Sequence, residues 1–215
     1  VIGRREEPLR DVCVGKESDY CCCDISKEGE VESAVKKALE KYGFIDVLVN
    51  NAGVHLNESP LTDLDERIID QTLGINVKGT LLVSKHVLKY MSQGQRGSII
   101  NLGSILGVIG AENMSAYTAS KGAVIAMTRS MAVEYADKGI RVNSISPSIT
   151  ETDMIKKIFS ENPGLEQKLY LAHPKREFIT THDVAQTALF LASDESKHLT
   201  GQNIVLDGGR SIYDR

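Results

Sequence analysis

Short apolar runs alternate along this chain with segments in which apolar residues recur every three or four positions. The runs predict buried strands, and the longer period predicts helices that bury one face. We predict strands at residues 20–23, 45–49, 98–102, 140–145 and 203–206, after a first strand that ends near Gly3. We predict helices at residues 30–42, 66–91, 115–136 and 183–192, with Thr181 or His182 as the cap of the last one.

This alternation predicts a doubly wound, Rossmann-like α/β fold. The predicted strands are apolar on both faces, which is typical of a parallel sheet covered by helices on both sides. A length of 215 residues fits a single domain with a full-sized core. Residues 146–181 form the longest stretch without clear regularity. A long irregular segment in a compact domain is often a lid or a binding loop.

The composition excludes several classes of partner. The net charge is −4 and the basic residues are scattered, so we expect no nucleic acid partner. No apolar run approaches the length that spans a bilayer, so we expect no membrane partner. Cys21, Cys22 and Cys23 are consecutive and Cys13 stands apart, which favours neither a disulfide framework nor a metal site. We interpret them as small hydrophobic residues of a cytoplasmic protein.

Polar and small residues follow three of the predicted strands. They are Asn50-Asn51-Ala52-Gly53, Gly103-Ser104 and Ser146-Pro147-Ser148. Ligands of doubly wound folds bind at the carboxyl ends of the strands. The three segments therefore predict one shared site at that edge of the sheet.

Tyr117 and Lys121 are the sharpest chemical pair in the sequence. They are four residues apart in a predicted helix, so both side chains project from one face. A free tyrosine is a poor base near neutral pH, and a neighbouring ammonium lowers the pKa of its phenol. Such a phenol can exchange a proton with a substrate hydroxyl. Ser104 at a strand end can hold the substrate oxygen meanwhile.

These residues carry a resemblance to the short-chain dehydrogenase/reductase family. Asn50-Asn51-Ala52-Gly53, Asn76, Ser104 and Tyr117-x-x-x-Lys121 match the family's motifs in order and spacing. Arg141-Val142-Asn143 and Gly201-Gln202 also fit, and the resemblance covers the whole chain. It implies an oxidoreductase that interconverts an alcohol and a carbonyl.

The resemblance also implies individual roles. Tyr117 would be the general acid/base, Lys121 would lower its pKa and hold the nicotinamide ribose, and Ser104 would orient the substrate carbonyl. Asn76 would support a water-linked proton path to Lys121. The remaining residues would contact the cofactor: Asp24 and Ile25 the adenine, Asn51, Ala52 and Gly53 the cleft, and Pro147, Thr150 and Thr152 the nicotinamide side.

The sequence departs from the family pattern in two places. Ser148 follows Pro147 where the family usually has glycine, which permits a closer backbone approach. The family's glycine-rich phosphate loop is not found, and the chain begins in what resembles the second strand. We therefore expect a longer natural protein whose first strand is central in the sheet. Its absence would leave the neighbouring strands with unpaired backbone groups.

Cofactor choice depends on the end of that strand, where Arg4 and Arg5 follow Gly3. An arginine there can pair with the extra phosphate of NADP, whereas NAD enzymes commonly carry an acid. We predict NADP, with NAD as the alternative. The basic pair can also simply open a helix beside Glu6 and Glu7.

The substrate is a small carbonyl or alcohol compound. The segment 150–154 resembles that of 3-oxoacyl-carrier-protein reductases, so such a reductase or a general carbonyl reductase is our first interpretation. Alternatives are an NAD-dependent sugar, polyol or steroid dehydrogenase, and a non-catalytic nucleotide-binding relative. Exposed lysines such as Lys156 and Lys157 could meet an acidic carrier, but we favour a solvated helix face. The resemblance implies a homotetramer or homodimer formed through the helices at 66–91 and 115–136.

The histidines form no metal-ligand spacing, and we expect most of them on the surface or in loops. They are His55, His86, His173, His182 and His198.

Overall fold

A four-stranded parallel sheet forms the centre of the computed structural model, which describes residues 1–56 and 59–213. Its strands, in spatial order, are β3 (Val47–Asn50), β4 (Gly97–Leu102), β5 (Ile140–Pro147) and β8 (Asn203–Leu206). Adjacent side chains of a strand point to opposite faces, and Ile99 and Ile100 accordingly belong to two separate apolar clusters. The predicted α/β fold with a doubly wound parallel sheet is confirmed.

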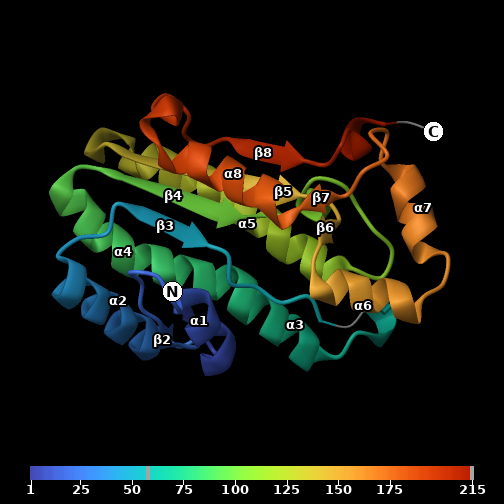
Figure 1. Ribbon diagram of the computed structural model, residues 1–215, viewed down its shortest axis with the longest axis horizontal. Coiled ribbons are helices and arrows are strands. Elements are labelled where there is room, and N and C mark those ends of the chain that lie inside the picture. Colours follow the sequence, from blue (N-terminus) through green and yellow to red (C-terminus); the bar gives the residue numbers. More distant parts are fainter. Residues whose placement is uncertain (57–58, 214–215) are drawn as a thin grey trace.

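Helices cover both faces of this sheet (Figure 1). On one face lie α4 (Thr80–Gly94) and α5 (Ser115–Tyr135), and on the other lies α8 (Thr181–Ala192). The larger cluster packs α4, α5 and α2 (Glu28–Tyr42) around Ile99 and Val142. The smaller one packs Leu191 of α8 against Ile100 and Ile145. Both sides of the central strands are therefore buried, which explains their apolar runs.

The helix predicted at residues 66–91 is continuous but changes its winding. It consists of α3 (Glu66–Leu73), a π-helical turn at Gly74–Gly79, and α4. Asp65 caps its beginning by accepting a hydrogen bond from the backbone N–H of Arg67. The π turn contains Asn76, which lies in the candidate site described below.

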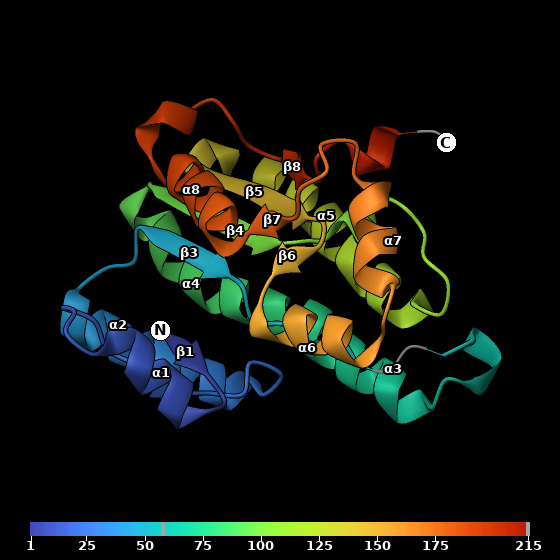
Figure 2. The same ribbon diagram turned by 45° about the vertical axis from the view of Figure 1, so that its right-hand side comes forward.

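A second, two-stranded sheet stands apart from the first (Figure 2). It pairs β1 (Ile2–Gly3) with β2 (Cys21–Cys22), and it carries α1 (Glu6–Cys13), a helix that we had not predicted. Within the described chain, β1 pairs only with β2 and β3 only with β4.

An apolar groove of about 480 Å³ lies between β1 and β3. Val1, Ile2, Val47 and Val49 are among its lining residues, and Val47 and Val49 are 38% and 44% exposed. Neither strand pairs across this groove in the described part of the chain.

Residues 146–181 contain regular structure, so our expectation of an irregular segment was wrong. They form β6 (Thr150–Glu151), α6 (Asp153–Glu161), α7 (Leu165–Ala172) and β7 (Ile179–Thr180), with β6 and β7 paired in parallel. Thr152 caps α6, while Lys156 and Lys157 face solvent as expected. Figures 1 and 2 place α6 and α7 beyond the carboxyl ends of the central strands. The segment thus does lie where a lid would lie.

The cap of α8 is Thr180, and our prediction of Thr181 or His182 was wrong. The Thr180 hydroxyl accepts from the N–H of Asp183, whose carboxylate in turn accepts from the Thr180 N–H. This reciprocal pair is a capping box, and the helix begins two residues earlier than the apolar pattern indicates.

The four cysteines are free thiols, with Cys13 and Cys23 buried and Cys22 exposed. The interpretation as small core residues therefore holds for two of them. Among the described residues, none of the helices is long and apolar enough to cross a membrane.

Candidate active site

The site is built where β3, β4 and β5 end. Their parallel register brings Asn50 beside Asn101 and Leu102 beside Ile145. The N–H of Gly103 also donates to the carbonyl of Ile145 at 2.8 Å, which continues the pairing past the end of β4. The three segments that follow these strands consequently meet at one edge, as the sequence predicted.

Helix α5 brings Lys121 into this edge. The Lys121 ammonium is buried and donates a hydrogen bond to the Leu102 carbonyl at 2.7 Å. Its Nζ atom also lies 5.8 Å from the centre of the Tyr117 ring. Burial lowers the pKa of Lys121 from 10.5 to about 8, because an ammonium is poorly solvated there. At neutral pH the side chain is still mostly charged.

Tyr117 lies on the same face of α5, but its ionisation differs from our expectation. Burial raises the pKa of its phenol above the ordinary 10.0, and a hydrogen bond with the Ser104 side chain acts in the opposite direction. The predicted lowering by Lys121 does not determine this pKa in the free protein, where desolvation of the phenolate is the largest effect. Tyr117 therefore holds its proton here.

Ser104 is also buried, directly after β4. Its hydroxyl oxygen accepts a hydrogen bond from the N–H of Leu106 at 3.2 Å and so begins a short 3₁₀ turn. This contact fixes the hydroxyl beside Tyr117. The structure thus brings Ser104 from the end of β4 to Tyr117 and Lys121 of α5, and these three residues were predicted as one group.

Asn76 connects this group to the loop after β3. Its amide oxygen accepts from the N–H of Val54 at 2.8 Å, and its amide nitrogen donates to the Val54 carbonyl and to the Ser120 hydroxyl. Ser120 in turn donates to the carbonyl of Tyr117 at 2.7 Å. Both donors of the amide are used, so Asn76 holds the loop and α5 in register.

His55 is a site residue that we missed. Its ring centre lies 4.7 Å from that of Tyr117, with the planes tilted by 49°. We had grouped it with the dispersed histidines, although it follows the Asn51-Ala52-Gly53 segment by only two residues. This closeness to the predicted cofactor segment could have identified His55 as a site residue from the sequence.

A pocket of about 500 Å³ lies beside β1 and the loop after β3. Six of the predicted cofactor residues line it: Arg4, Asp24, Ile25, Asn51, Ala52 and Gly53. Its volume is in the range of small-molecule sites.

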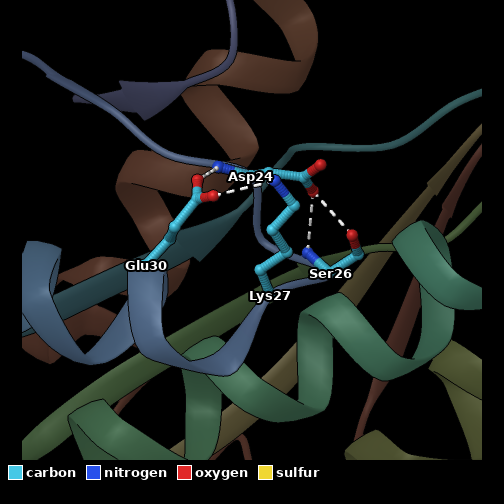
Figure 3. Close-up of polar contacts among 4 residues, drawn as sticks. All are labelled: Asp24, Ser26, Lys27 and Glu30. Atoms are coloured by element: carbon cyan, nitrogen blue, oxygen red, sulfur yellow. Dashed lines mark hydrogen bonds and ion pairs between the residues drawn. The ribbon is translucent and has the colours of Figure 1, made fainter.

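The Asp24 carboxylate within this pocket is held in a fixed orientation (Figure 3). One of its oxygens accepts from both the N–H and the hydroxyl of Ser26, at 3.0 and 2.7 Å. The Asp24 N–H donates to Glu30, which also pairs with Lys27. The hydrogen bond from the Ser26 side chain is the largest cause that lowers the pKa of Asp24, so a carboxylate faces the pocket at neutral pH.

Gly53 joins this pocket to the Tyr117 group. A Cβ atom at Gly53 would lie 3.2 Å from the Asn76 amide oxygen and 3.6 Å from the Lys121 ammonium. A side chain at this position would therefore crowd the Asn76 amide. The residues present therefore fit an elongated dinucleotide, whose one end would lie beside Arg4 and Asp24 and whose other end would reach Lys121.

Pro147 ends β5, and Thr150 and Thr152 follow it at the same edge. Pro147 is in register with Leu206 of β8, the Thr150 hydroxyl donates to the Ser148 carbonyl, and Thr152 caps α6. No contact between Thr150 or Thr152 and Tyr117 occurs within the described part of the chain. Ser148 itself is buried and bonded to His173, which lies in the loop after α7 but is buried there.

Comparison with known proteins agrees with this geometry. A family model described as enoyl-(acyl carrier protein) reductase matches residues 3–211. The chain belongs to the short-chain dehydrogenase/reductase family. It is 39% identical over 199 residues to 3-oxoacyl-[acyl-carrier-protein] reductase FabG of Thermotoga maritima, which covers 92% of this chain and 78% of that protein. It is 41% identical over 202 residues to short-chain dehydrogenase reductase ATA1 of Arabidopsis thaliana, covering 88% and 74%.

Solved structures of this oxidoreductase family share the fold. NAD⁺-bound xylitol dehydrogenase superposes with a TM-score of 0.92 at 31% identity, covering 97% of this chain and 87% of that one. ElxO with NADP bound gives a TM-score of 0.92 at 32% identity, covering 99% and 88%. These structures support a nicotinamide cofactor for this short-chain dehydrogenase/reductase and leave the choice between NAD and NADP open. The predicted enzyme class, an NAD(P)-dependent oxidoreductase acting on CH–OH groups, agrees with the named relatives.

Proposed function

We propose that the chain transfers hydride between NADP(H) and a carbonyl or secondary alcohol, with Tyr117 as the general acid/base. The observation that carries this proposal is the group formed by Ser104, Tyr117 and Lys121 at the carboxyl edge of the sheet. A bound nicotinamide would supply or accept the hydride, and the protein's residues would orient the substrate and move the proton.

The three side chains divide the work by their chemistry. Ser104 orients the substrate oxygen, because its hydroxyl is already fixed beside Tyr117. The phenol of Tyr117 holds its proton in the free protein and can donate it to an oxygen that gains negative charge during reduction. Lys121 holds the ribose of the nicotinamide and favours the phenolate that remains, because it is a buried cation near the ring.

The cofactor residues are those of the pocket and of the segment after β5. Asp24 and Ile25 contact the adenine, Asn51 and Ala52 line the cleft, and Gly53 leaves the passage to Lys121 open. Pro147, Thr150 and Thr152 serve the nicotinamide side. Arg4 lines the pocket beside Asp24 and lowers its pKa through its charge. A cation there suits the extra phosphate of NADP, so we assign NADP as the preferred cofactor.

The substrate class follows from the wall next to Ser104. Ile105, directly after the serine, is buried. Leu106 and Ile109 are partly buried, and Val108 is exposed. This wall suits an apolar group beside the reacting carbonyl. The Thermotoga maritima relative supports a 3-oxoacyl-carrier-protein substrate, but the exposed lysines on and after α6 are balanced by carboxylates, as in the pairs Lys157–Glu161 and Lys175–Glu177. We therefore propose the class of substrate and no individual compound.

Tyr117→Phe tests the proposed function, because it removes only the phenol oxygen. We expect turnover of a panel of carbonyl substrates with NADPH to fall by about 10²- to 10⁴-fold. Affinity for NADPH, followed by nicotinamide fluorescence, should change little. Tyr135→Phe, a partly buried tyrosine at the far end of α5, is the matched control and should retain wild-type turnover. Undiminished turnover in Tyr117→Phe would exclude the assigned role, and the non-catalytic alternative would stand if wild type binds NADPH without turnover.

We also propose that the chain forms a homodimer or homotetramer. Leu81 on α4 and Val133 on α5 are 44% and 83% exposed, on the two helices that the family resemblance assigns to subunit contacts.

A further inference from the structure

Ser148 belongs to a buried polar cluster behind the candidate site. Its hydroxyl lies 2.8 Å from Nε2 of His173 and 3.3 Å from Nη1 of Arg210. His173 is fully buried, and Ser148 and Asp207 are buried as well. Three parts of the chain meet here: the end of β5, the end of α7 and the segment that follows β8. A polar cluster without solvent must satisfy its own hydrogen bonds.

The direction of each hydrogen bond in this cluster follows from its partners. Nδ1 of His173 lies 2.7 Å from the carbonyl oxygen of Leu169, which can only accept, so Nδ1 carries a hydrogen. In the neutral ring Nε2 is then an acceptor, and the Ser148 hydroxyl donates to it. The Ser148 oxygen accepts from the Arg210 guanidinium. The chain of bonds therefore runs from Arg210 through Ser148 and His173 to Leu169.

Protonation of His173 would remove the acceptor to which the Ser148 hydroxyl donates. Nε2 would become a donor, Ser148 would have to turn its hydrogen away, and that hydrogen would find no acceptor among the described contacts of the cluster. The charged groups that face His173 come from the segment after β8: Arg210 opposes a second positive charge and Asp207 favours it.

The other neighbours of His173 do not compensate for a charge. The Asp207 carboxylate already accepts from the N–H groups of Gly209 and Ser211. From the segment before β7, the ring of Phe178 packs edge-on with centres 5.6 Å apart, and α7 offers only the Leu169 carbonyl. Burial is the largest cause that lowers the pKa of His173.

We propose that Ser148 and His173 form a latch that adds to the backbone bonds from this segment to β7 and Leu206, holds residues 148–152 against α7 while His173 is neutral, and loosens them when it is protonated. Both are positioning residues. The latch gives a physical reason for the serine at a position where the family usually has glycine. Its effect on cofactor affinity rests on the proposed function, because Thr150 and Thr152 lie in the held segment.

The pH range of this latch follows from the direction of the pKa change. The pKa of His173 in the closed state lies below the ordinary 6.5, so closure is fully favoured above pH 6.5 and weakens as the pH falls below it. Once the segment opens, His173 takes up a proton with an ordinary pKa. Opening should therefore become more frequent between pH 7.5 and pH 5.5, by at most about tenfold.

Amide hydrogen exchange on the full chain measures this opening directly. After correction for intrinsic rates, peptides covering residues 148–152 and 165–173 should exchange faster at pH 5.5 than at pH 7.5, by at most about tenfold. In Ser148→Ala and Ser148→Gly they should exchange fast at both values. Ser160→Ala, which removes a hydroxyl bonded to Lys157 on α6, should behave like wild type. Exchange that does not depend on pH in wild type, or that stays slow in both Ser148 variants, would overturn the latch.

Cofactor binding then separates the latch from the proposed function. The ratio of the NADPH dissociation constants at pH 5.5 and pH 7.5 should be about threefold larger for wild type than for Ser148→Ala. Titration of the cofactor itself cancels in this comparison. Equal ratios would overturn the effect on the cofactor. Absence of NADPH binding by wild type at both values would refute the proposed function, and the exchange result would still decide on the latch.

Discussion

Lys121→Met should make the free protein more stable while it abolishes turnover. The buried ammonium of Lys121 has a pKa of about 8, against 10.5 for an ordinary lysine. One pKa unit corresponds to about 1.4 kcal/mol, so charging this buried group costs about 3 kcal/mol of folding free energy at pH 7. Methionine has a similar shape and carries no charge, and it loses the hydrogen bond to the Leu102 carbonyl, worth about 1–2 kcal/mol.

The expected net gain at pH 7 is therefore about 1–2 kcal/mol in the free energy of unfolding. The way this gain in stability depends on pH shows whether the buried charge of Lys121 is its cause. A group with a lowered pKa in the folded state contributes its stability above the unfolded pKa of 10.5, and loses it as the pH falls through the folded pKa near 8. The advantage of Lys121→Met over wild type should shrink by about 2 kcal/mol between pH 7 and pH 10.

Urea unfolding at pH 7 and pH 10 measures both quantities. Lys37→Met, at an exposed position on α2, should change the free energy of unfolding by less than about 0.5 kcal/mol at either pH. A Lys121→Met protein that is less stable than wild type at pH 7, or whose difference from wild type does not change with pH, would refute the argument that burial destabilises the charge. Turnover lost together with stability would indicate a purely structural role for Lys121.

Two further substitutions test the pocket and the sheet. Arg4→Asp places a carboxylate beside Asp24 and should weaken NADPH binding by about tenfold or more while NADH binding changes less, as measured by nicotinamide fluorescence; equal losses for both cofactors would contradict the phosphate assignment. Arg141→Met should cost about 2–3 kcal/mol in urea unfolding, because the guanidinium donates to the carbonyls of Leu191 and Ser193 at the end of α8; a loss below about 0.5 kcal/mol would show that these carbonyls find other partners.

The central strands and long helices were predictable because each has a simple environment. The apolar run at residues 203–206 coincides with β8, and the strand predicted at residues 98–102 differs from β4 by one residue. Both strands belong to a sheet that helices cover, and their apolar side chains Ile100, Ile204 and Leu206 pack in one cluster. Helix α5 is long enough for its period to be read without knowledge of its partners.

The segment after β5 was not predictable in the same way. Helices α6 and α7 span nine and eight residues, too short for a period to stand out. The burial of His173 was invisible as well, because its partner Ser148 lies 25 residues earlier and the apolar surroundings come from a third segment. Such contacts exist only once the sheet has brought distant segments together.

In the candidate site, too, the sequence predicted what depends on local spacing and missed what depends on burial. Spacing along one helix identified Tyr117 and Lys121, because four residues complete about one turn. The direction of the Tyr117 pKa was missed, since spacing records the nearby cation but not the loss of water around the phenol.

The π-helical turn around Asn76 shows how the chain keeps a polar site inside a packed core. The carbonyl of Asn76 accepts the hydroxyl of Thr80 at 2.8 Å, so that backbone acceptor is satisfied within the same helix. The amide of Asn76 is then free to hold both backbone groups of Val54 and the hydroxyl of Ser120. One side chain thereby fixes the loop after β3 against α5. Burial of the Lys121 charge costs stability in the free protein, and a bound cofactor ribose would offset that cost. A site arranged in this way stays assembled before its ligand arrives and gains stability when the ligand binds.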